Sequence, residues 1–559
     1  MKFFVYCFTV IILSNLLGIQ LMKDDFISFG FVLLLLITFL LRNVIYKVFK
    51  LTLIILSVIS FFNILSYYSN NQNLVTNKNF RISEKLSKDI VVSSKNIIPK
   101  RYLIKNFENI DKVDIGMVLN LNGNIEKSNY YDIGVVGEII DYTINSYQKD
   151  LYSIFIGMKS IIKELFTDNF GVERGNILSS LVFGDTSSLD KEYKNDLKEL
   201  GIVHILSVSG FHINLIFGIL SKILSFLPSI IATFIYLVLT GFKVSGIRAF
   251  SMVFIREMSP RVHRNYDGIN ALCVAGSLIL LIRPYEVLRL GFIYSFVSTL
   301  GILLFNSKIK DYLYRLPKLL SEPISLIISA QIFIIPVNLI INRKLELGFL
   351  LSNIFLVPFY SLLVILSIVF VFFSFIPLFK EITVYLIKII FDVIDGGIIL
   401  IKMFTPESIY LINILIIFIV MLYILYFFRK KISFKTFNKL VLILSFVYIG
   451  TITMINSSVE VGKYYDKNYV IIRNKDRSYL YLDGNLKNID QLIDKLGVDK
   501  VFTNINNNQD SSIISGVKVE FINKKVVLYV DKKKIEVNNM EDNFKYYSDI
   551  YPQKYYFIF

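Results

Sequence analysis

Side chains that bind metals or form disulfides are scarce in this chain of 559 residues. The two cysteines, Cys7 and Cys273, both lie inside apolar runs, so we expect neither a disulfide framework nor a cysteine metal site. Only three histidines occur, which excludes a histidine-rich metal centre. A G-x-x-x-x-G-K-S/T segment is absent, so the chain should not hydrolyse ATP. We therefore expect no cofactor.

Charged residues are also few, at 19%, whereas about 25% is usual in a soluble globular protein. Hydrophobic residues make up 54%, and the mean hydropathy is +0.58. They gather in long runs, and residues 355–375, for example, contain no charge. A run of about 18 such residues is typical of a membrane-spanning helix. Because many such runs recur, the sequence predicts a polytopic membrane protein.

The net charge of +16 at pH 7 has two explanations. Basic loops that face the cytoplasm and contact anionic lipid are the common one. A polyanionic substrate is the more specific one. Composition leaves both open.

Three hydrophobic segments open the chain, at about 3–21, 27–41 and 51–67. Residues 42–50, between the second and the third, include three basic and no acidic side chains. This loop is expected to be cytoplasmic, which places the N-terminus inside and the chain after residue 68 outside. The first segment lacks a small-x-small cleavage site, so we expect an uncleaved span.

The composition becomes polar between about residues 70 and 150. The stretches DIVVSS, KRYLIKN, GMVLNLNG and GVVGEII are typical of strands, with turn residues such as Asn122 and Gly123 between them. A five-stranded OB-like barrel is one candidate fold. Ten apolar segments follow between residues 205 and 454, the last two near 409–428 and 438–454. The basic loop before the last segment should be cytoplasmic, which places the polar C-terminal segment outside.

The sequence thus predicts a mostly α, polytopic membrane protein with about 10–13 transmembrane or re-entrant helices. A small external β (OB-like) domain and a short external α/β C-terminal domain complete it. The expected domains are N-terminal membrane helices (1–68), the OB-like domain (69–150), a membrane domain (151–455) and the external α/β domain (456–559).

The segment from Gly201 to Leu220 places polar and ionisable groups inside an apolar run. Such groups at membrane depth usually face a cavity or another helix. Ser-x-Ser-Gly is expected to interrupt the helix, with Ser209 as the N-cap of a new helix that begins near Gly210. The polar members of the segment are His204, Ser207, Ser209, His212 and Asn214.

A helix that starts inside the membrane presents free backbone N–H groups, which form a site for anions such as phosphate. Packing against neighbouring helices is the competing explanation for the serines and histidines. An intramembrane Ser/His hydrolase is disfavoured, because no acidic partner lies nearby in the sequence.

A basic cluster extends from Lys243 to Arg289, with seven positive and three negative side chains. Arg248, in SGIRAF near the start of an apolar segment, is the candidate for a functional role. Arg261 and Arg264 are more typical of an ordinary positive loop.

At these residues the sequence resembles the ComEC family of competence membrane proteins. The matching elements are ILSSLVFGD (177–185), ELGIVHILSVSGFHINLI (199–216), SGIRAF (245–250), INAL (269–272), RP (283–284) and GFIYSF (291–296). The resemblance implies uptake of transforming DNA, in which one strand enters through the membrane and the other is degraded outside. Carried over position by position, it implies these pathway residues: Gly184, Asp185, His204, Ser207, Ser209, Gly210, His212, Arg248, Gly291 and Ser295.

The C-terminal segment departs from the family pattern. Many members end in a metallo-β-lactamase-like domain with T-H-x-H-x-D-H metal ligands. After Thr503 this chain has amide side chains where ligands would be expected, at Asn504, Asn506, Asn508 and Gln509. Neutral amides are poor zinc ligands, so we expect a degenerate domain that binds no metal and cuts no DNA. A chance match of a short strand–helix–strand unit is the alternative.

The leading prediction is a channel, not an enzyme, that passes single-stranded DNA across the bacterial cytoplasmic membrane during natural transformation. The alternative is a membrane transporter for another anionic solute, and a third hypothesis is a non-conducting assembly protein. The expected partners are single-stranded DNA, membrane lipid, a cytoplasmic ATP-driven motor and an external DNA receptor.

Overall fold

The computed structural model describes residues 3–405 with short gaps, and after residue 405 chiefly the strands between 409 and 558. The gaps before residue 405 are 24, 42–46, 70–73, 86–88, 96–98, 108–112, 114, 128–130, 343 and 347. The chain divides into two units. One comprises Met1–Ile335 with Glu346–Glu407, and the other comprises Pro336–Leu345 with Ser408–Phe559.

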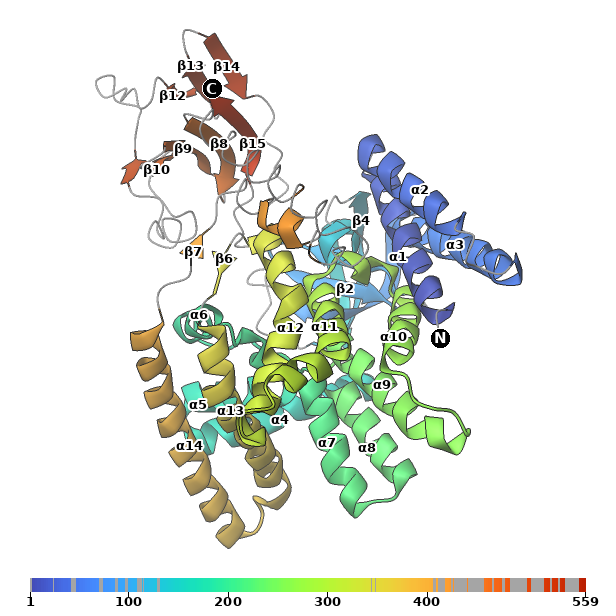
Figure 1. Ribbon diagram of the computed structural model, residues 1–559, viewed down its shortest axis with the longest axis vertical. Coiled ribbons are helices and arrows are strands. Elements are labelled where there is room, and N and C mark those ends of the chain that lie inside the picture. The colour runs from blue at the N-terminus through green and yellow to red at the C-terminus, as the bar shows by residue number, and fades with distance from the viewer. Residues whose placement is uncertain are drawn as a thin grey trace. The chain divides into compact units, whose positions relative to one another are not determined.

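The chain begins with three helices that confirm the three predicted hydrophobic segments (Figure 1). They are α1 (Phe3–Met22), α2 (Phe26–Leu40) and α3 (Lys47–Tyr68). Buried polar pairs join α1 to α3. The hydroxyls of Ser14 and Ser57 lie 2.8 Å apart, and the Ser60 hydroxyl donates to Oδ1 of Asn15 over 2.8 Å. Interhelical hydrogen bonds of this kind contribute about 1 kcal/mol between membrane helices.

Among the described residues, eleven further helices follow the barrel described below. They are α4 (Leu151–Phe170), α5 (Val172–Phe183), α6 (Lys191–Glu199), α7 (Gly210–Ile223), α8 (Phe226–Leu239), α9 (Val244–Arg261), α10 (Gly268–Ile282), α11 (Leu290–Tyr312), α12 (Lys318–Asn342), α13 (Phe349–Phe373) and α14 (Pro377–Phe404). Short 3-10 turns among the described residues are η3 (Val203–Leu206) and η4 (Pro284–Leu288) in this part, and η2 (Tyr131–Ile133) between barrel strands. Helices α7, α8 and α9 pack against one another (Figure 1).

Within the described residues, five helices are long and apolar enough to cross a membrane, namely α1, α3, α11, α12 and α13. Four shorter apolar helices accompany them: α2, α7, α8 and α10. The prediction of a mostly helical, multi-pass membrane protein is confirmed. The last two predicted spans are 409–428 and 438–454. The first of them begins with a two-residue strand, β7 (Ile409–Tyr410), which pairs with β6 (Lys344–Leu345). Most of both spans lies outside the described residues.

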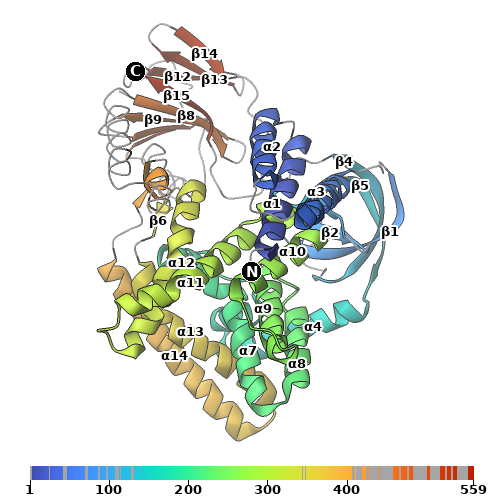
Figure 2. The same cartoon turned by 45° about the vertical axis from the view of Figure 1, so that its right-hand side comes forward.

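A closed five-stranded β-barrel lies between α3 and α4 in the sequence, as predicted. The strand order is β1-β2-β3-β5-β4, with β3 parallel to β5 and the other pairs antiparallel. Figure 2 shows β1 on the side of the barrel that faces away from α1 and α10. The strands are β1 (Leu74–Lys85), β2 (Ile90–Ser94), β3 (Arg101–Ile104), β4 (Val118–Lys127) and β5 (Val135–Gln148).

The turn predicted at Asn122 and Gly123 is wrong. Strand β4 runs through both residues, and its register with β5 shifts between Asn122 and Asn124. A Cβ on Gly123 would lie 2.9 Å from the Ile139 side chain and 3.1 Å from the Ile140 carbonyl. Glycine therefore marks a bulge where two backbones approach closely, a role that a sequence pattern does not distinguish from a turn.

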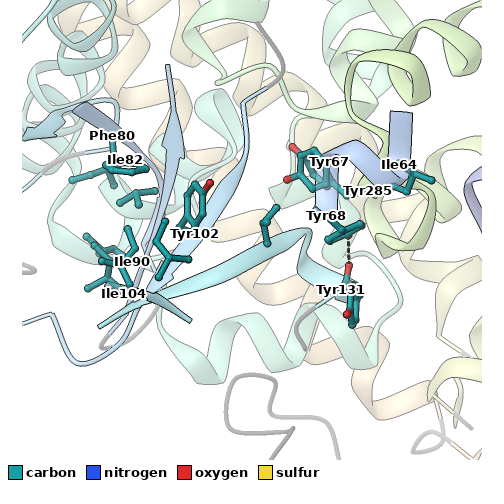
Figure 3. Packing of buried hydrophobic residues seen from close by; sticks show 14 of the residues in the cluster. Ile64, Tyr67, Tyr68, Phe80, Ile82, Ile90, Tyr102, Ile104, Tyr131 and Tyr285 are labelled. Carbon is teal, nitrogen blue, oxygen red and sulfur yellow. Dashed lines mark hydrogen bonds between the residues drawn. The ribbon is translucent and has the colours of Figure 1, made fainter. Parts of the chain in front are cut away.

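A group of tyrosines joins the barrel to the helices (Figure 3). The Tyr67 hydroxyl at the end of α3 donates to the Gly134 carbonyl over 2.7 Å, and the Tyr68 hydroxyl donates to the Tyr131 carbonyl over 3.1 Å. The Tyr285 ring lies 5.0 Å from the Tyr67 ring. Gly134 has φ +72, and a Cβ there would meet the Tyr285 ring at 2.3 Å. The barrel is thus packed directly against η4.

An ion cluster forms the second part of this joint. Glu84 of β1 pairs with Arg101 of β3 at 2.8 Å and with Arg289, just before α11, at 3.0 Å. The Arg101 side chain is only 5% exposed, whereas that of Glu84 is 37% exposed. Burial alone would raise the pKa of the Glu84 carboxyl, but the two arginines outweigh burial and lower it to about 2. The cluster therefore depends on an ionised Glu84.

Besides the short β6–β7 pair, the described residues of the second unit form two larger β-sheets. A five-stranded sheet has the order β11-β10-β9-β8-β15, and a three-stranded sheet has the order β12-β13-β14. Strands are expected of the α/β domain predicted for residues 456–559, and residues 483–499 of that domain lie outside the described residues. The strands are β8 (Ser457–Tyr464), β9 (Lys467–Asn474), β10 (Ser478–Leu482), β11 (Lys500–Thr503), β12 (Val517–Ile522), β13 (Lys525–Val530), β14 (Lys533–Val537) and β15 (Pro552–Ile558).

Replacing Glu84 by glutamine should destabilise the joint by about 1–3 kcal/mol, because a buried guanidinium loses its charged partner. The folded pKa of about 2 lies below the ordinary value of 4.5, so the stabilisation is fully present above pH 4.5 and is lost as the pH falls toward 2. Thermal unfolding of the purified chain should give a lower midpoint for E84Q at neutral pH, and the difference from the native chain should shrink below pH 4.5. Equal midpoints at neutral pH would contradict this, and E126Q, at an exposed position of β4, is the matched control.

Candidate functional site

The predicted break in the segment after α6 is present. Gly201 adopts φ +68 after α6, the short turn η3 follows, and Ser207 is extended. Ser209 is the extended N-cap of α7, which begins at Gly210. The chain therefore starts a new helix within the group α7 to α9, and the sequence prediction of Ser209 as the N-cap is confirmed.

His212 closes the start of α7. Its Nδ1 accepts a hydrogen bond from the Ser209 backbone N–H over 3.1 Å, and the Ser209 hydroxyl lies 3.0 Å from the same nitrogen. A ring nitrogen that accepts a bond carries no hydrogen, so in the neutral ring the hydrogen is on Nε2. His212 is 1% exposed, and its Nε2 has no hydrogen-bond partner in the described part of the chain. The site thus contains a buried N–H donor that lacks an acceptor.

Arg248 of α9 supplies a second donor beside the first turn of α7. It is 8% exposed, and its Nε has no hydrogen-bond partner among the described residues. A Cβ on Gly210 would lie 2.5 Å from Nη2 of Arg248, so only glycine allows the guanidinium to lie against this turn. A cation at the positive end of a helix is unfavourable by itself, and an anion placed there is attracted by both.

The loop after α5 lies against the same break. Gly184 ends α5 with φ +71, and the Lys243 ammonium donates to its carbonyl. A Cβ on Gly184 would approach the Val208 nitrogen to 2.9 Å, and the Ser245 hydroxyl donates to the Val208 carbonyl over 2.6 Å. The structure therefore brings the two family motifs ILSSLVFGD and SGIRAF together at the backbone of Val208.

Asp185 extends this loop toward the surface. Its carboxylate accepts bonds from the backbone N–H and the hydroxyl of Ser187, at 3.0 and 2.7 Å. Burial alone would raise the Asp185 pKa, but these bonds and nearby lysines lower it. Lys159 of α4 is one of those lysines, and burial, opposed by Asp185, lowers the Lys159 pKa to about 8. Two cations, Lys159 and Lys243, thus flank Asp185.

The remaining candidates lie apart from the Ser209–His212–Arg248 group. His204 is exposed on η3, and its carbonyl accepts a bond from the Ser207 hydroxyl over 2.9 Å. Gly291 is exposed near the start of α11, with no neighbouring atom within 4 Å of a Cβ placed on it. Ser295, one turn later, has a buried hydroxyl without a partner among described residues. Among the described residues, no hydrogen bond joins Gly291 or Ser295 to the group around Arg248.

Sequence reasoning did not single out Lys159 or Ser245, and it named Lys243 only as a member of a basic cluster. Lys243 and Ser245 flank the first residue of the SGIRAF helix, and their contacts with Gly184 and Val208 are the missed feature. A lysine at a helix start carries no signal of which distant carbonyl it binds, so spacing alone does not find this contact.

Within the part of the chain that the structure describes, no group of three or more His, Cys, Asp or Glu side chains could hold a metal ion. Asn504, Asn506, Asn508 and Gln509, which stand where the sequence comparison expected ligands, lie outside the described residues. Their part in the predicted degenerate domain stays a prediction.

Residues 181–431 match the family described as Competence protein, so this segment is a competence-family domain within a multi-pass membrane protein. The match includes the break before α7, the loop at Gly184 and Arg248. The resemblance inferred from the motifs is confirmed for this domain.

Among curated proteins, the chain is similar to ComE operon protein 3 of Bacillus subtilis, with 25% identity over 284 residues, which are 44% of this chain and 35% of that protein. It is 25% identical to Recombination protein 2 of Haemophilus influenzae over 228 residues, 36% of this chain and 29% of that protein. The MG316 homolog of Mycoplasma pneumoniae is 28% identical over 170 residues, 29% of this chain and 42% of that protein. The alignments thus span less than half the length of these relatives. No solved structure matches the chain.

Replacing Gly184 by alanine should destabilise the protein by about 1–3 kcal/mol, because alanine is strained at φ +71 and its Cβ would press on Val208 and Lys243. The matched control is G218A in α7, where a Cβ meets no atom within 4 Å. Thermal unfolding in detergent should show a lower midpoint for G184A and little change for G218A. If both variants unfold at the native temperature, Gly184 is not needed for this close approach.

Proposed function

We propose that this protein conducts single-stranded DNA across a bacterial cytoplasmic membrane during natural transformation. The proposal rests on two buried donors beside the N-terminus of α7, His212 Nε2 and Arg248 Nε, which have no hydrogen-bond partner among the described residues. Membership of residues 181–431 in the competence family supports DNA as the anion.

The geometry favours a passing phosphate over a tightly held cofactor. Arg248 and the start of α7 attract an anion, and the neutral His212 ring adds a donor without a full charge. Lys243 and Lys159 continue the positive groups toward Asp185. A polymer that moves must bind strongly enough to enter each site and weakly enough to leave it.

The proposal includes the orientation and the partners. The N-terminus is cytoplasmic and the barrel and the C-terminal unit are external, in agreement with the basic residues 42–50. Because the sequence contains no Walker-type segment, a cytoplasmic ATP-driven motor pulls the strand. An external receptor delivers the DNA, and membrane lipid surrounds the helices.

The first experiment measures uptake of labelled duplex DNA in cells that carry the native chain or R248A. Loss of one charged donor costs about 1.5–3 kcal/mol, so internal single strands should decrease by at least tenfold. The matched control is R256A, because Arg256 is an exposed arginine eight residues later on the same helix. R256A should leave uptake nearly unchanged, and both variants must reach the membrane at native levels.

Three outcomes would contradict the channel or the role of Arg248 in it. If the membrane-inserted native chain passes no DNA when motor and receptor are supplied, transport of another anionic solute replaces it. If R248A and R256A reduce uptake equally, Arg248 does not line the path. If R248A lowers only the amount of folded protein, the third hypothesis, a non-conducting assembly protein, is favoured.

We also propose that the chain itself hydrolyses no DNA. The proposal rests on the amide side chains at 504–509, which are poor metal ligands. Purified full-length protein incubated with labelled duplex DNA and Zn²⁺, Mn²⁺ or Mg²⁺ should leave the DNA intact. Metal-dependent cleavage that copurifies with the chain and vanishes with chelator would overturn this point and leave the channel proposal untouched.

A further inference from the structure

The outward side of barrel strands β1, β4 and β5 carries an unusual concentration of asparagine. Along β5 the exposed residues alternate at 141, 143, 145 and 147, and β4 places its polar side chains outward in the same way. Asn79 of β1 lies opposite Asn120 of β4, and Asn120 lies opposite Ser146 of β5. This asparagine face consists of Asn77, Asn79, Asn120, Asn122 and Asn145.

The five amides are held in fixed orientations by one another. Nδ2 of Asn145 donates to Oδ1 of Asn77 and of Asn120, at 2.8 and 3.0 Å. Nδ2 of Asn120 donates to Oδ1 of Asn79 over 2.9 Å, and the Asn77 backbone N–H donates to Oδ1 of Asn122 over 2.6 Å. The network crosses all three strands, so it presents a preorganised surface of amides and not five independent side chains.

The network leaves hydrogen-bonding capacity for a ligand. Asn77 and Asn79 use their side-chain oxygens as acceptors, while their Nδ2 groups donate to no other described residue. Both residues are exposed. An amide has two donors and an acceptor with two lone pairs, so each offers unused donors at the surface.

The asparagine face is nearly free of charge in a chain with a net charge of +16. The charges beside it are few and of both signs: Lys78 between Asn77 and Asn79, Asp141 and Glu126, and an ion pair of Arg81 with Asp150. Tyr147, which is 49% exposed, follows Asn145 on the same side of β5 and offers an apolar ring surface. Single-stranded nucleic acid is bound by grooves that are positively charged as well as aromatic, which this face is not.

The opposite part of the barrel is closed. OB-type barrels bind oligonucleotides and oligosaccharides on the face of strands 2 and 3. Here three outward residues of β2 and β3 are buried, with Val91 1%, Arg101 4% and Leu103 0% exposed, and Ser93 is half-buried. Arg101 contributes to the joint with Glu84 and Tyr285. A ligand of the barrel therefore has the asparagine face available instead.

We propose that the asparagine face binds a neutral glycan strand. A sugar hydroxyl donates one hydrogen bond and accepts two, which matches the mixed donors and acceptors of an amide row. The apolar side of a sugar ring fits the exposed Tyr147 ring, and the absence of a positive groove suits an uncharged polymer. The barrel would then hold the protein against surface polysaccharide beside the membrane, independently of the path at Arg248.

The test uses the full chain in lipid nanodiscs. The probe is a hexamer of N-acetylglucosamine, and a thymidine oligonucleotide is measured beside it as the alternative ligand. The informative variant is N77D together with N79D, because aspartate keeps the Oδ acceptors for Asn145 and Asn120 and replaces each free Nδ2 donor by a charged oxygen that only accepts. The matched control is N195D, at an exposed asparagine of α6. Calorimetry should show saturable glycan binding that is insensitive to salt, weakened at least tenfold in the double variant and unchanged in N195D.

Each other outcome overturns the proposal. Absence of glycan binding to the native chain, or equal weakening by N195D, removes the assignment. Oligonucleotide binding with a steep salt dependence that N77D/N79D abolishes would make the face a nucleic-acid surface instead. Thermal unfolding is measured on the same samples to show that each variant is folded. If the double variant unfolds at a lower temperature than the native chain, Y147A is used in its place, and it must also weaken glycan binding. DNA uptake is measured separately, so failure here does not bear on the channel.

Discussion

The start of α7 inside the helical domain is the constraint on which the rest of the site depends. A helix that begins there leaves backbone N–H groups without intrahelical acceptors, and a membrane supplies no water to replace them. Ser209 and His212 satisfy part of this need through a reciprocal cap. Gly210 then allows Arg248 to lie against the same turn. The result is a concentration of positive potential at Arg248, to which no carboxylate of the described part of the chain is paired.

The barrel and the helices are connected by charges and rings at one joint. Glu84 links β1 to β3 and to the residue before α11, and Tyr67 links the end of α3 to the backbone at Gly134. Since Arg289 precedes the helix that carries Gly291 and Ser295, the barrel fixes the start of that helix.

Much of the architecture followed from patterns along the chain. Long apolar runs predicted α1, α3, α11, α12 and α13, because a hydrocarbon core requires them whatever their neighbours are. Alternation in residues 89–140 predicted four barrel strands, but β1 went unrecognised and Asn122-Gly123 was misread as a turn. Both errors arise at bulges, where the register shifts and the alternation of side chains is interrupted.

The sequence by itself determined that this is a multi-pass membrane protein with a competence-type domain and a helix interruption at Ser209. These features are local, since hydropathy, a cap residue and a glycine act within a few residues of themselves. Only the tertiary structure decided that Lys243 reaches Gly184, that Arg248 lies over Gly210, and that asparagines 23 to 68 residues apart form one bonded face. Such contacts join segments whose separation in sequence carries no information on their distance in space, because the packing of whole helices and strands brings them together.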